Sequence, residues 1–478
     1  IAMTLFTLAT TVVLYQLARE RYFFPAISLV LSLSMLTSMV FYHSSVAVFV
    51  QTAVAFNIIY FLIIAASHIF YNQLLYAYRN LYDILIIYKP LPPARPHIPG
   101  KKNILVFNWR DTKSVFAGGA ETYVQALASR WVKDGHSVTL FTSNDGHLPP
   151  NGETDGVRII RRGGFYATYV IASLYYLFHF RGTFDVIVDS ENGIPFFTPL
   201  YATEPVYCLV HHIHQDVFRK SLVWPLSSFA CFLERDFMPL VYRNCNFITV
   251  SDSSKQAMET LNITTKDIQV VNPGIDTNFL TPGKKAFVPT VSYVGRLKEH
   301  KSVHVLIEAF KEVLARVPDA ELIIAGDGEE ENNLKRLTQK LDLGNSVSFR
   351  GKVSEEEKRD ILRTSWVFVT PSMIEGWGIT TIEANACGTP VIASDVSGLR
   401  DSVRDGETGL LVPYGDTGAL AEKIILVLVD GTLRKILSRY AIVWSQNFEW
   451  SKSSQKFIEA ISSREFISHH EASLVNRT

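Results

Sequence analysis

Two glutamates that flank a glycine-containing segment are the residues of this sequence best suited to bind a ligand rich in hydroxyl groups. Glu375 and Glu383 lie eight residues apart, and Gly376 and Gly378 stand between them. Glycines allow a tight loop whose backbone amides face a ligand, and a helix that begins at Ile379 would add its N-terminal N–H groups. One carboxylate could bind sugar hydroxyls and the other a ribose. Acids at this spacing are common on helix surfaces, so the glycine loop carries the signal.

Two cations follow another apolar run. Arg296 comes directly after Gly295 at the end of residues 290–294, and Lys301 follows five residues later, just before an expected helix. At the end of a strand and close to a helix N-terminus, these cations could neutralise a diphosphate through charge-assisted hydrogen bonds. Taken alone, they are more simply explained as solvated surface charges.

A glycine pair lies in the first half of the sequence. Gly118 and Gly119 precede an expected helix and follow the first expected strand of that half. A plain turn is the usual explanation of such a pair, but in a first strand-to-helix loop the backbone could approach the same phosphates.

Three histidines follow the apolar run 206–210. His211 comes first after this run and could contact a transferred sugar or an acceptor, and His212 and His214 follow it. Such a cluster also suggests a metal site. Neighbouring histidines on an extended segment point in different directions, however, and no further ligand cluster is evident in the sequence. We therefore expect no metal ion, and we expect some of these histidines to be structural.

The elements that must position these residues alternate between strands and helices. In the first half, β-branched runs predict strands at 104–109, 137–142, 157–161, 185–189, 206–210 and 247–250. Helices are expected at 120–133 and 253–261. In the second half the expected strands are 290–294, 321–325, 346–350, 366–370 and 390–393, with helices at 303–316, 330–341 and 355–364. Alternation of this kind indicates parallel sheets and an α/β fold. We expect two Rossmann-like domains that face each other across a ligand-binding cleft.

Composition excludes several classes of protein. The 478 residues carry 46 Lys and Arg against 46 Asp and Glu, so no charge excess favours a nucleic-acid partner. Four cysteines lie far apart without a C-x-x-C pair, which argues against a zinc site or a disulfide-stapled domain.

The first fifth of the sequence is suited to lipid. Residues 1–88 contain only five charged side chains and three apolar runs, 1–18, 22–42 and 46–70, whereas a spanning helix needs about 20 residues. We expect three spans. The positive-inside rule places Arg19, Arg21 and the basic residues of 89–102 on the cytoplasmic side and His43-Ser44-Ser45 outside. Residue 1 lies within apolar sequence and is not Met, so we expect a longer natural chain.

Two further segments are apolar without being long enough to span. Residues 71–89 mix tyrosines with Leu and Ile at helical spacing, which suits either a helix at the headgroup level or a packed core helix. Residues 166–180 predict a core helix, with a membrane-dipping surface as the alternative. The proline-rich segment 90–96 predicts a semi-rigid spacer.

Together these residues resemble the retaining glycosyltransferases of family 4, which have the GT-B fold. The resemblance covers residues 103–461 and is carried by elements in the expected order: Gly118-Gly119, Asn272-Pro273-Gly274-Ile275-Asp276, Gly295-Arg296-Leu297 with Lys301, and Glu375 with Glu383. The segment Phe448-Glu449-Trp450-Ser451 and the following helix resemble the family's last helix, which crosses back to the first domain.

The resemblance implies a role for each position. Glu375 would bind the donor sugar, Glu383 the nucleotide ribose, and Arg296 and Lys301 the donor diphosphate. His211 matches the active-site histidine best, although the doublet with His212 leaves the assignment open by one position. The implied catalytic residues are His211 and Glu375, and the implied donor-binding residues are Gly118, Gly119, Arg296, Lys301, Gly376, Trp377, Gly378, Ile379 and Glu383. Loops at 326–328 and 349–351 resemble those that line the nucleotide pocket.

The apolar runs, the proline-rich spacer and the resemblance together give a domain division, and the resemblance implies a reaction. The expected parts are 1–88 transmembrane or interfacial helices, 89–102 linker, 103–271 acceptor domain, 272–447 nucleotide-sugar donor domain, and 448–478 crossover helix and tail. The family transfers a sugar from a nucleotide donor with retention of configuration. Because no Asp-x-Asp motif occurs, we expect metal-independent transfer without a cofactor, with cations and helix dipoles in place of a metal ion.

The apolar segment suggests the acceptor. Most family members are soluble or peripheral, so a multi-pass anchor favours a membrane-borne acceptor, either a lipid-linked saccharide or a glycolipid, with the catalytic domains on the cytoplasmic side. A GT-B nucleotide-sugar epimerase is one alternative, but it would need no anchor. A non-catalytic sugar-nucleotide-binding subunit of a membrane complex is the other. A phosphorylase would need a pyridoxal-phosphate lysine site, for which no convincing pattern is present.

Overall fold

The computed structural model describes residues 2–18, 23–41, 45–69, 71–92, 98–115 and 117–462. The predicted loops around Arg19–Arg21 and His43-Ser44, part of the predicted spacer, and the predicted tail beyond Ser462 lie outside these residues. Internal contacts divide the chain into two units, Ile1–Ile86 and Ile87–Thr478.

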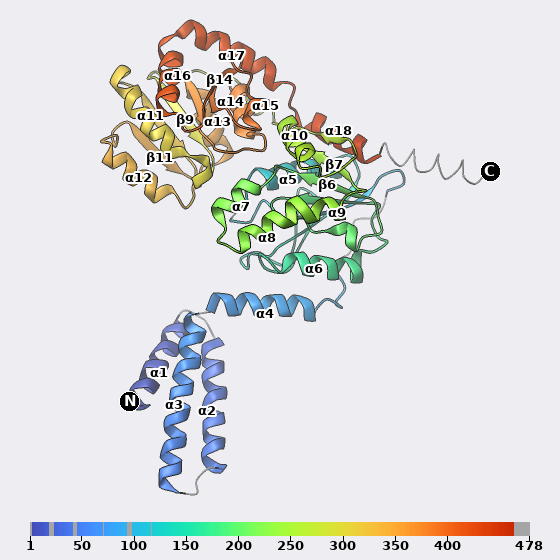
Figure 1. Cartoon of the computed structure of the whole chain (residues 1–478), viewed down its shortest axis with the longest axis vertical. Helices are drawn as coiled ribbons and strands as arrows, with labels where there is room; N and C mark the ends of the chain where they lie inside the picture. Colours follow the sequence, from blue (N-terminus) through green and yellow to red (C-terminus); the bar gives the residue numbers. More distant parts are fainter. Residues whose placement is uncertain are drawn as a thin grey trace, which may run out of the picture. The chain divides into compact units, whose positions relative to one another are not determined.

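The first unit contains apolar helices that pack on one another. They are α1 (Ala2–Ala18), α2 (Phe23–Phe41) and α3 (Val46–Ile69), and Figure 1 shows them side by side in blue, followed by α4 (Tyr71–Leu85). Ser28 Oγ and Tyr60 hydroxyl lie 2.8 Å apart and join α2 to α3. By length and composition, two described segments could cross a membrane, Phe24–Phe41 and Val46–Ile69, whereas the apolar part of α1, Thr4–Leu17, is shorter.

The second unit contains two separate sheets. The first has the order β3 (Asn151–Thr154), β4 (Val157–Arg161), β2 (Ser137–Thr142), β1 (Asn103–Asn108), β5 (Val186–Glu191), β6 (Val206–Val210), β7 (Asn246–Thr249) and β8 (Ile268–Val270). Neighbouring strands are parallel except for the β3–β4 pair. All six strands expected in this half are present, and β3 and β8 were not predicted.

The second sheet is parallel throughout. Its order is β11 (Val347–Gly351), β10 (Glu321–Ala325), β9 (Thr290–Val294), β12 (Val367–Thr370), β13 (Val391–Ser394) and β14 (Gly409–Val412). The five expected strands are present, and β14 was not predicted. Fully buried runs such as Thr290–Val294 are typical of parallel strands covered by helices on both faces.

Helices cover both sheets. Those of the first half are α5 (Gly119–Lys133), α6 (Thr168–Tyr175), the π-helical η1 (Tyr176–Phe180), the 3-10 turn η2 (Thr198–Leu200), α7 (Gln215–Ser221), α8 (Leu226–Phe232), the π-helical η3 (Leu233–Phe237), α9 (Met238–Val241) and α10 (Asp252–Thr260). Those of the second half are the 3-10 turn η4 (Glu299–Lys301), α11 (Val303–Arg316), α12 (Glu331–Lys340), α13 (Glu355–Thr364), α14 (Ile379–Ala386), α15 (Leu399–Ser402), α16 (Thr417–Val429) and α17 (Gly431–Ser445), followed by α18 (Trp450–Ser462). The five helices whose bounds were predicted here are present, to within a residue or two at each end.

Local sequence explains where several of these helices form. In α11 the buried side chains Val303, Leu306, Phe310 and Val313 recur at helical spacing and form one apolar stripe. α13 begins at a capping box, in which Ser354 Oγ accepts from the amide of Glu357.

The last helix returns to the first half, as predicted. α18, in red in Figure 1, packs against α5, and the Trp131 and Phe457 rings lie 5.0 Å apart. The Tyr207 hydroxyl donates to the carbonyl of Ile461 at 3.2 Å. These contacts tie the end of the second half to the first sheet.

The apolar segment at 166–180 forms α6 and η1, and one of its faces is buried. Ile171, Tyr175 and Phe180 belong to the core of the first half, whereas Val170 and Phe178 are exposed. The prediction of a core helix is confirmed for the buried face.

Candidate active site

A cavity of about 590 Å³ lies between the carboxyl ends of the two sheets. Its walls come from the loops after β1, β5 and β6 in the first half and after β9 and β12 in the second. All predicted catalytic and donor-binding residues except Glu383 line it: Gly118, Gly119, His211, Arg296, Lys301, Glu375, Gly376, Trp377, Gly378 and Ile379. No residue of the loops at 326–328 and 349–351, which the resemblance placed at the nucleotide pocket, lines this cavity. The fold therefore brings together residues that are up to 261 positions apart in the sequence.

The carboxylate of Glu375 is held by two donors. Lys301 Nζ lies 2.5 Å from its Oε1, and the Ser372 hydroxyl donates to the same oxygen at 2.9 Å. Both members of the ion pair are mostly buried, with 20% and 16% of the side chain exposed. Among the described residues, no hydrogen-bond donor contacts its second carboxylate oxygen, and Glu375 lines the cavity, where this oxygen could bind sugar hydroxyls.

The glycines after Glu375 permit a close approach between the two halves. A Cβ atom on Gly376 would lie 2.6 Å from the carbonyl oxygen of His211, which is closer than real Cβ contacts come. Gly378 has φ +80°, a conformation that favours glycine, and α14 begins directly after it. The glycine loop therefore fits against the first half and presents the N-terminus of α14 to the cavity.

His211 is buried in the wall of the cavity. Its Nε2 lies 3.2 Å from the Ser190 hydroxyl, and its ring meets Tyr123 edge-on at 5.7 Å. Burial lowers the pKa of His211 to about 3, so the imidazole is neutral at physiological pH. A neutral imidazole can exchange hydrogen bonds with a hydroxyl without adding charge. His212 also lines the cavity, so the choice between the two histidines stays open.

Arg296 joins the second half to the loop that contains the glycine pair. Its Nη1 donates to the carbonyl of Val115 at 3.1 Å and to that of Ala117 at 3.4 Å, and its Nε lies 3.8 Å from Asp327. Arg296 thus lies beside Gly118, which is the arrangement expected if both bind the same phosphate.

The sequence matches two family descriptions over adjoining ranges. Residues 117–279 match Glycosyltransferase Family 4, and residues 278–444 match Glycosyl transferases group 1.

The chain belongs to glycosyltransferase family 4.

Curated relatives carry glycosyltransferase names. The chain is 30% identical over 228 residues to the D-inositol 3-phosphate glycosyltransferase of Corynebacterium jeikeium (strain K411), covering 44% of this chain and 54% of that protein. It is 31% identical over 243 residues to the enzyme of the same name from Mycobacterium sp. (strain KMS), covering 47% and 54%. The chain therefore spans about half the length of these relatives.

Solved structures share the fold. Sucrose-phosphate synthase from Thermosynechococcus elongatus superposes with a TM-score of 0.67 at 23% identity, covering 77% of this chain and 100% of that one. Anabaena Alr3699/HepE in complex with UDP-glucose gives a TM-score of 0.61 at 20% identity, covering 76% and 100%. The two Rossmann-like domains are thus those of a GT-B glycosyltransferase, as the sequence predicted.

In this glycosyltransferase Glu383 lies apart from the other predicted residues. It is on α14, but it does not line the cavity, and its carboxylate is 2.8 Å from Lys358 Nζ on α13. Lys358 also contacts Glu355 at 2.7 Å. A ribose that used Glu383 would have to share the carboxylate with Lys358.

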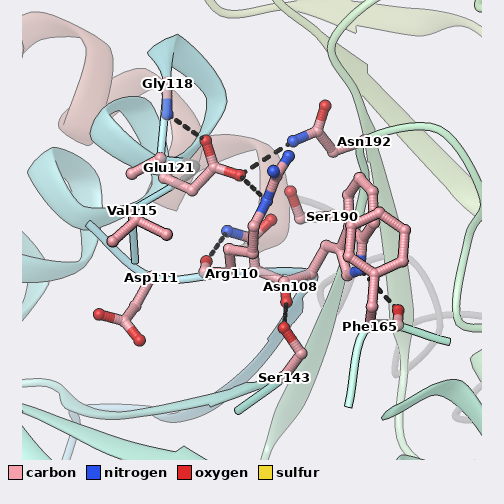
Figure 2. A network of polar contacts seen from close by, with 12 residues as sticks. Asn108, Arg110, Asp111, Val115, Gly118, Glu121, Ser143, Phe165, Ser190 and Asn192 are labelled. Atoms are coloured by element: carbon pink, nitrogen blue, oxygen red, sulfur yellow. Dashed lines mark hydrogen bonds and ion pairs between the residues drawn. The ribbon is translucent and has the colours of Figure 1, made fainter. Parts of the chain in front are cut away.

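Sequence reasoning missed a polar network in the first half, which Figure 2 shows from close by. The buried carboxylate of Glu121 accepts from the backbone N–H of Gly118 at 2.7 Å, from Arg110 Nε at 3.2 Å and from Asn192 Nδ2 at 3.1 Å. Arg110, Glu121 and Asn192 all line the cavity. Arg110 directly follows the predicted strand 104–109, and Asn192 comes three residues after the predicted strand 185–189. This position near the carboxyl ends of strands is the signal that could have found them.

Among the described residues, one group has the chemistry of a metal site. Glu191, His214 and Glu234 are buried, and their ligand atoms lie within 4.8 Å of one another. The expectation that the histidines lack a ligand cluster was wrong, because the glutamates come from distant segments. Burial alone would lower the pKa of His214, but Glu191 and Glu234 raise it to about 10. With His214 protonated the group is an ion cluster, and a metal ion would have to displace this proton; the absence of a metal stays a prediction.

Proposed function

We propose that this glycosyltransferase transfers a sugar from a nucleotide donor to a membrane-borne acceptor, with retention of configuration and without a metal ion. The observation that carries the proposal is the single cavity where Glu375, His211 and the cations Arg296 and Lys301 meet. One structural neighbour was solved with UDP-glucose, which supports a nucleotide-sugar donor.

The geometry supports front-face attack by the acceptor hydroxyl. The acids that line the cavity are Glu121 and Glu375, and both are already bound by hydrogen-bond donors. We propose that neither acts as a covalent nucleophile. The departing diphosphate would accept the proton of the attacking hydroxyl, and the carboxylate of Glu375 and the neutral His211 would orient the sugar.

The charge of the cavity supports transfer without a metal. Four cationic side chains line it against two carboxylates: Arg110, Arg296, Lys298 and Lys301, against Glu121 and Glu375. Arg296 and Lys301, with the N-terminus of α14, can stabilise the charge of a leaving diphosphate, which is the work of a divalent ion in other transferases.

The apolar helices support a membrane-borne acceptor. α2 and α3 have the length and composition of membrane spans, and α1 adds a third apolar helix. We propose that the chain is a multi-pass membrane protein with its catalytic domains on the cytoplasmic side, where nucleotide sugars are made, and that the acceptor is a lipid-linked saccharide or a glycolipid.

A panel assay tests the proposal. The full chain, purified in detergent, is incubated with radiolabelled nucleotide sugars and a native lipid extract, with and without a chelator. Label that enters the organic phase despite the chelator supports the proposal and names the donor. A donor that is isomerised while label stays in the aqueous phase would point to an epimerase. A donor that is bound but unchanged would point to a binding subunit. Loss of transfer with the chelator would refute metal independence.

A further inference from the structure

Arg110 is held rigidly at the carboxyl end of β1. Its carbonyl accepts from Asn108 Nδ2 at 2.7 Å, and its guanidinium carbon lies 4.2 Å from the centre of the Trp109 ring. Its Nε donates to Glu121, which is itself fixed by Gly118 and Asn192 (Figure 2). Only 14% of the Arg110 side chain is exposed. The position of the guanidinium is therefore set before any ligand arrives.

Most of the hydrogen-bonding capacity of this guanidinium is unused. A guanidinium carries five N–H donors, and among the described residues only Nε of Arg110 has a recorded protein partner. The two Nη groups belong to a side chain that lines the cavity. A planar pair of such donors matches the oxygens of a phosphate or carboxylate.

A second cation lies close to Arg110. Lys298 also lines the cavity, and burial, together with the charges of Arg110 and Arg296, lowers its pKa. A lysine whose pKa is lowered by burial and by neighbouring cations gains from a bound anion. Glu121 offsets part of this charge, but its carboxylate is already engaged by three donors.

Aromatic side chains adjoin Arg110. Trp109 Nε1 donates to the carbonyl of Phe165 at 2.9 Å, the two rings lie 4.3 Å apart, and Tyr166 follows at 4.7 Å from Phe165. All three line the cavity, and 72% of Tyr166 is exposed. Such a wall can cover the apolar faces of a sugar or the first part of a lipid chain.

We propose that Arg110 binds the phosphate group of a phosphorylated acceptor, with Trp109 and Phe165 against the group that carries the phosphate. The inference rests on the proposed transferase function and specifies its acceptor. Arg110, Glu121 and Asn192 all belong to the first half, whereas Lys301 and Glu375, which we assign to the donor, belong to the second. We therefore assign an anion bound by Arg110 to the acceptor, and the KM of the donor in Arg110→Gln tests this assignment. A soluble sugar phosphate and a lipid-linked phosphate share this chemistry.

Kinetics with matched acceptors test the proposal. The full chain in detergent receives the donor found by the panel assay and two acceptor pairs. One pair is a hexose phosphate and the free hexose. The other is a polyprenyl-diphosphate-linked sugar and a diacylglycerol-linked sugar in mixed micelles. We expect wild type to prefer the phosphorylated member of at least one pair by about tenfold or more in kcat/KM. The pair that shows this preference identifies the source of the phosphate.

Three variants attribute the preference to Arg110. Arg110→Gln should remove it while the KM of the donor stays unchanged, and Arg110→Lys, which keeps the charge but loses the fork, should retain part of it. Arg316→Gln, an exposed arginine outside the cavity, is the control and should behave like wild type. If thermal unfolding shows that Arg110→Gln is not folded, the acceptor preference of Arg110→Lys still tests the role of Arg110.

Two results would overturn the inference. One is equal use of both members of each pair by wild type. The other is a rise in the KM of the donor, instead of the acceptor, in Arg110→Gln. Neither result touches the proposed transferase activity, which fails if wild type transfers no sugar to any acceptor.

Discussion

The two walls of the cavity are built differently. In the second half, Glu375, Gly376, Gly378 and the start of α14 come from one short segment, and Lys301 bonds to Glu375 directly. In the first half, Glu121 gathers partners from separate segments, including Asn192, which is 71 residues away. A wall made of one local motif can be recognised in the sequence, whereas a wall made of distant contacts requires the fold.

The local wall should be the more sensitive of the two. We expect Glu375→Ala and Lys301→Ala each to abolish transfer, lowering kcat by about 100-fold or more, while folding and membrane insertion persist. Because Lys301 and Glu375 act through one ion pair, the double variant should lose little more than either single variant. Steady-state kinetics on the three variants measure this coupling. Full activity in either single variant would contradict the assignment of Lys301 and Glu375 to the active site.

The contact between the walls depends on Gly376. Gly376→Ala would place a methyl group 2.6 Å from the carbonyl oxygen of His211, so either the loop or the first half must move. We expect a loss of unfolding free energy of about 1–3 kcal/mol and a clear rise in the KM of the donor.

Gly344→Ala is the matched control, since nothing lies within 4 Å of a Cβ at that position. Thermal unfolding and donor kinetics compare the two variants. Equal behaviour of both would mean that the halves do not meet at Gly376 during catalysis.

Much of the fold could be predicted because its strands are apolar and short. The bounds of β2, β4, β6, β9 and β10 agree with the sequence analysis residue for residue. β3 was missed because Asn-Gly-Glu-Thr has no apolar alternation, and it forms by pairing with β4 across a turn. β14 has only four residues, and it pairs with β13 from a segment that begins 15 residues after β13 ends.

The site follows the same division. Residues of the glycine loop were predicted because loop, strand and helix start are adjacent in sequence. Arg110 was missed because its importance comes from Glu121, whose own pairing with Asn192 no local pattern reveals. Glu191, His214 and Glu234 were missed as a cluster for the same reason. In both cases a buried carboxylate gathers polar groups that only the fold brings near.

The buried ion cluster of the first half should appear in the pH dependence of stability. The pKa of His214 is about 10 in the folded state and near 6.5 when unfolded, so the folded state binds the extra proton between these values. Stability from this group is complete below pH 6.5 and is lost as pH rises toward 10, on the order of 1 kcal/mol per pH unit.

Denaturant unfolding of the detergent-purified chain at pH 7, 8 and 9 measures this loss. His214→Gln should remove the slope in this range. An exposed histidine offers the control, since His304→Gln on α11 should leave the slope unchanged. An identical pH profile in wild type and His214→Gln would show that His214 is neutral in the fold, and the cluster would then be open to a metal ion. The comparison of the two proteins also removes the opposite contribution of Lys285, whose pKa burial lowers to about 8.

The smallest effect is expected at Glu383, the one member of the local motif that lies outside the cavity wall. Its carboxylate is 2.8 Å from Lys358, so Glu383→Gln should raise the KM of the donor by less than about tenfold and leave kcat unchanged.

Lys358→Gln separates two reasons for such a rise. If Glu383 binds the ribose, releasing it from Lys358 should leave donor binding intact or tighter; if the ion pair only braces α13 against α14, both variants should lose the same unfolding free energy and the same donor affinity. A fall in kcat as large as that of Glu375→Ala would place Glu383 at the reacting centre. The second wall would then also contain a role that its local motif alone does not reveal.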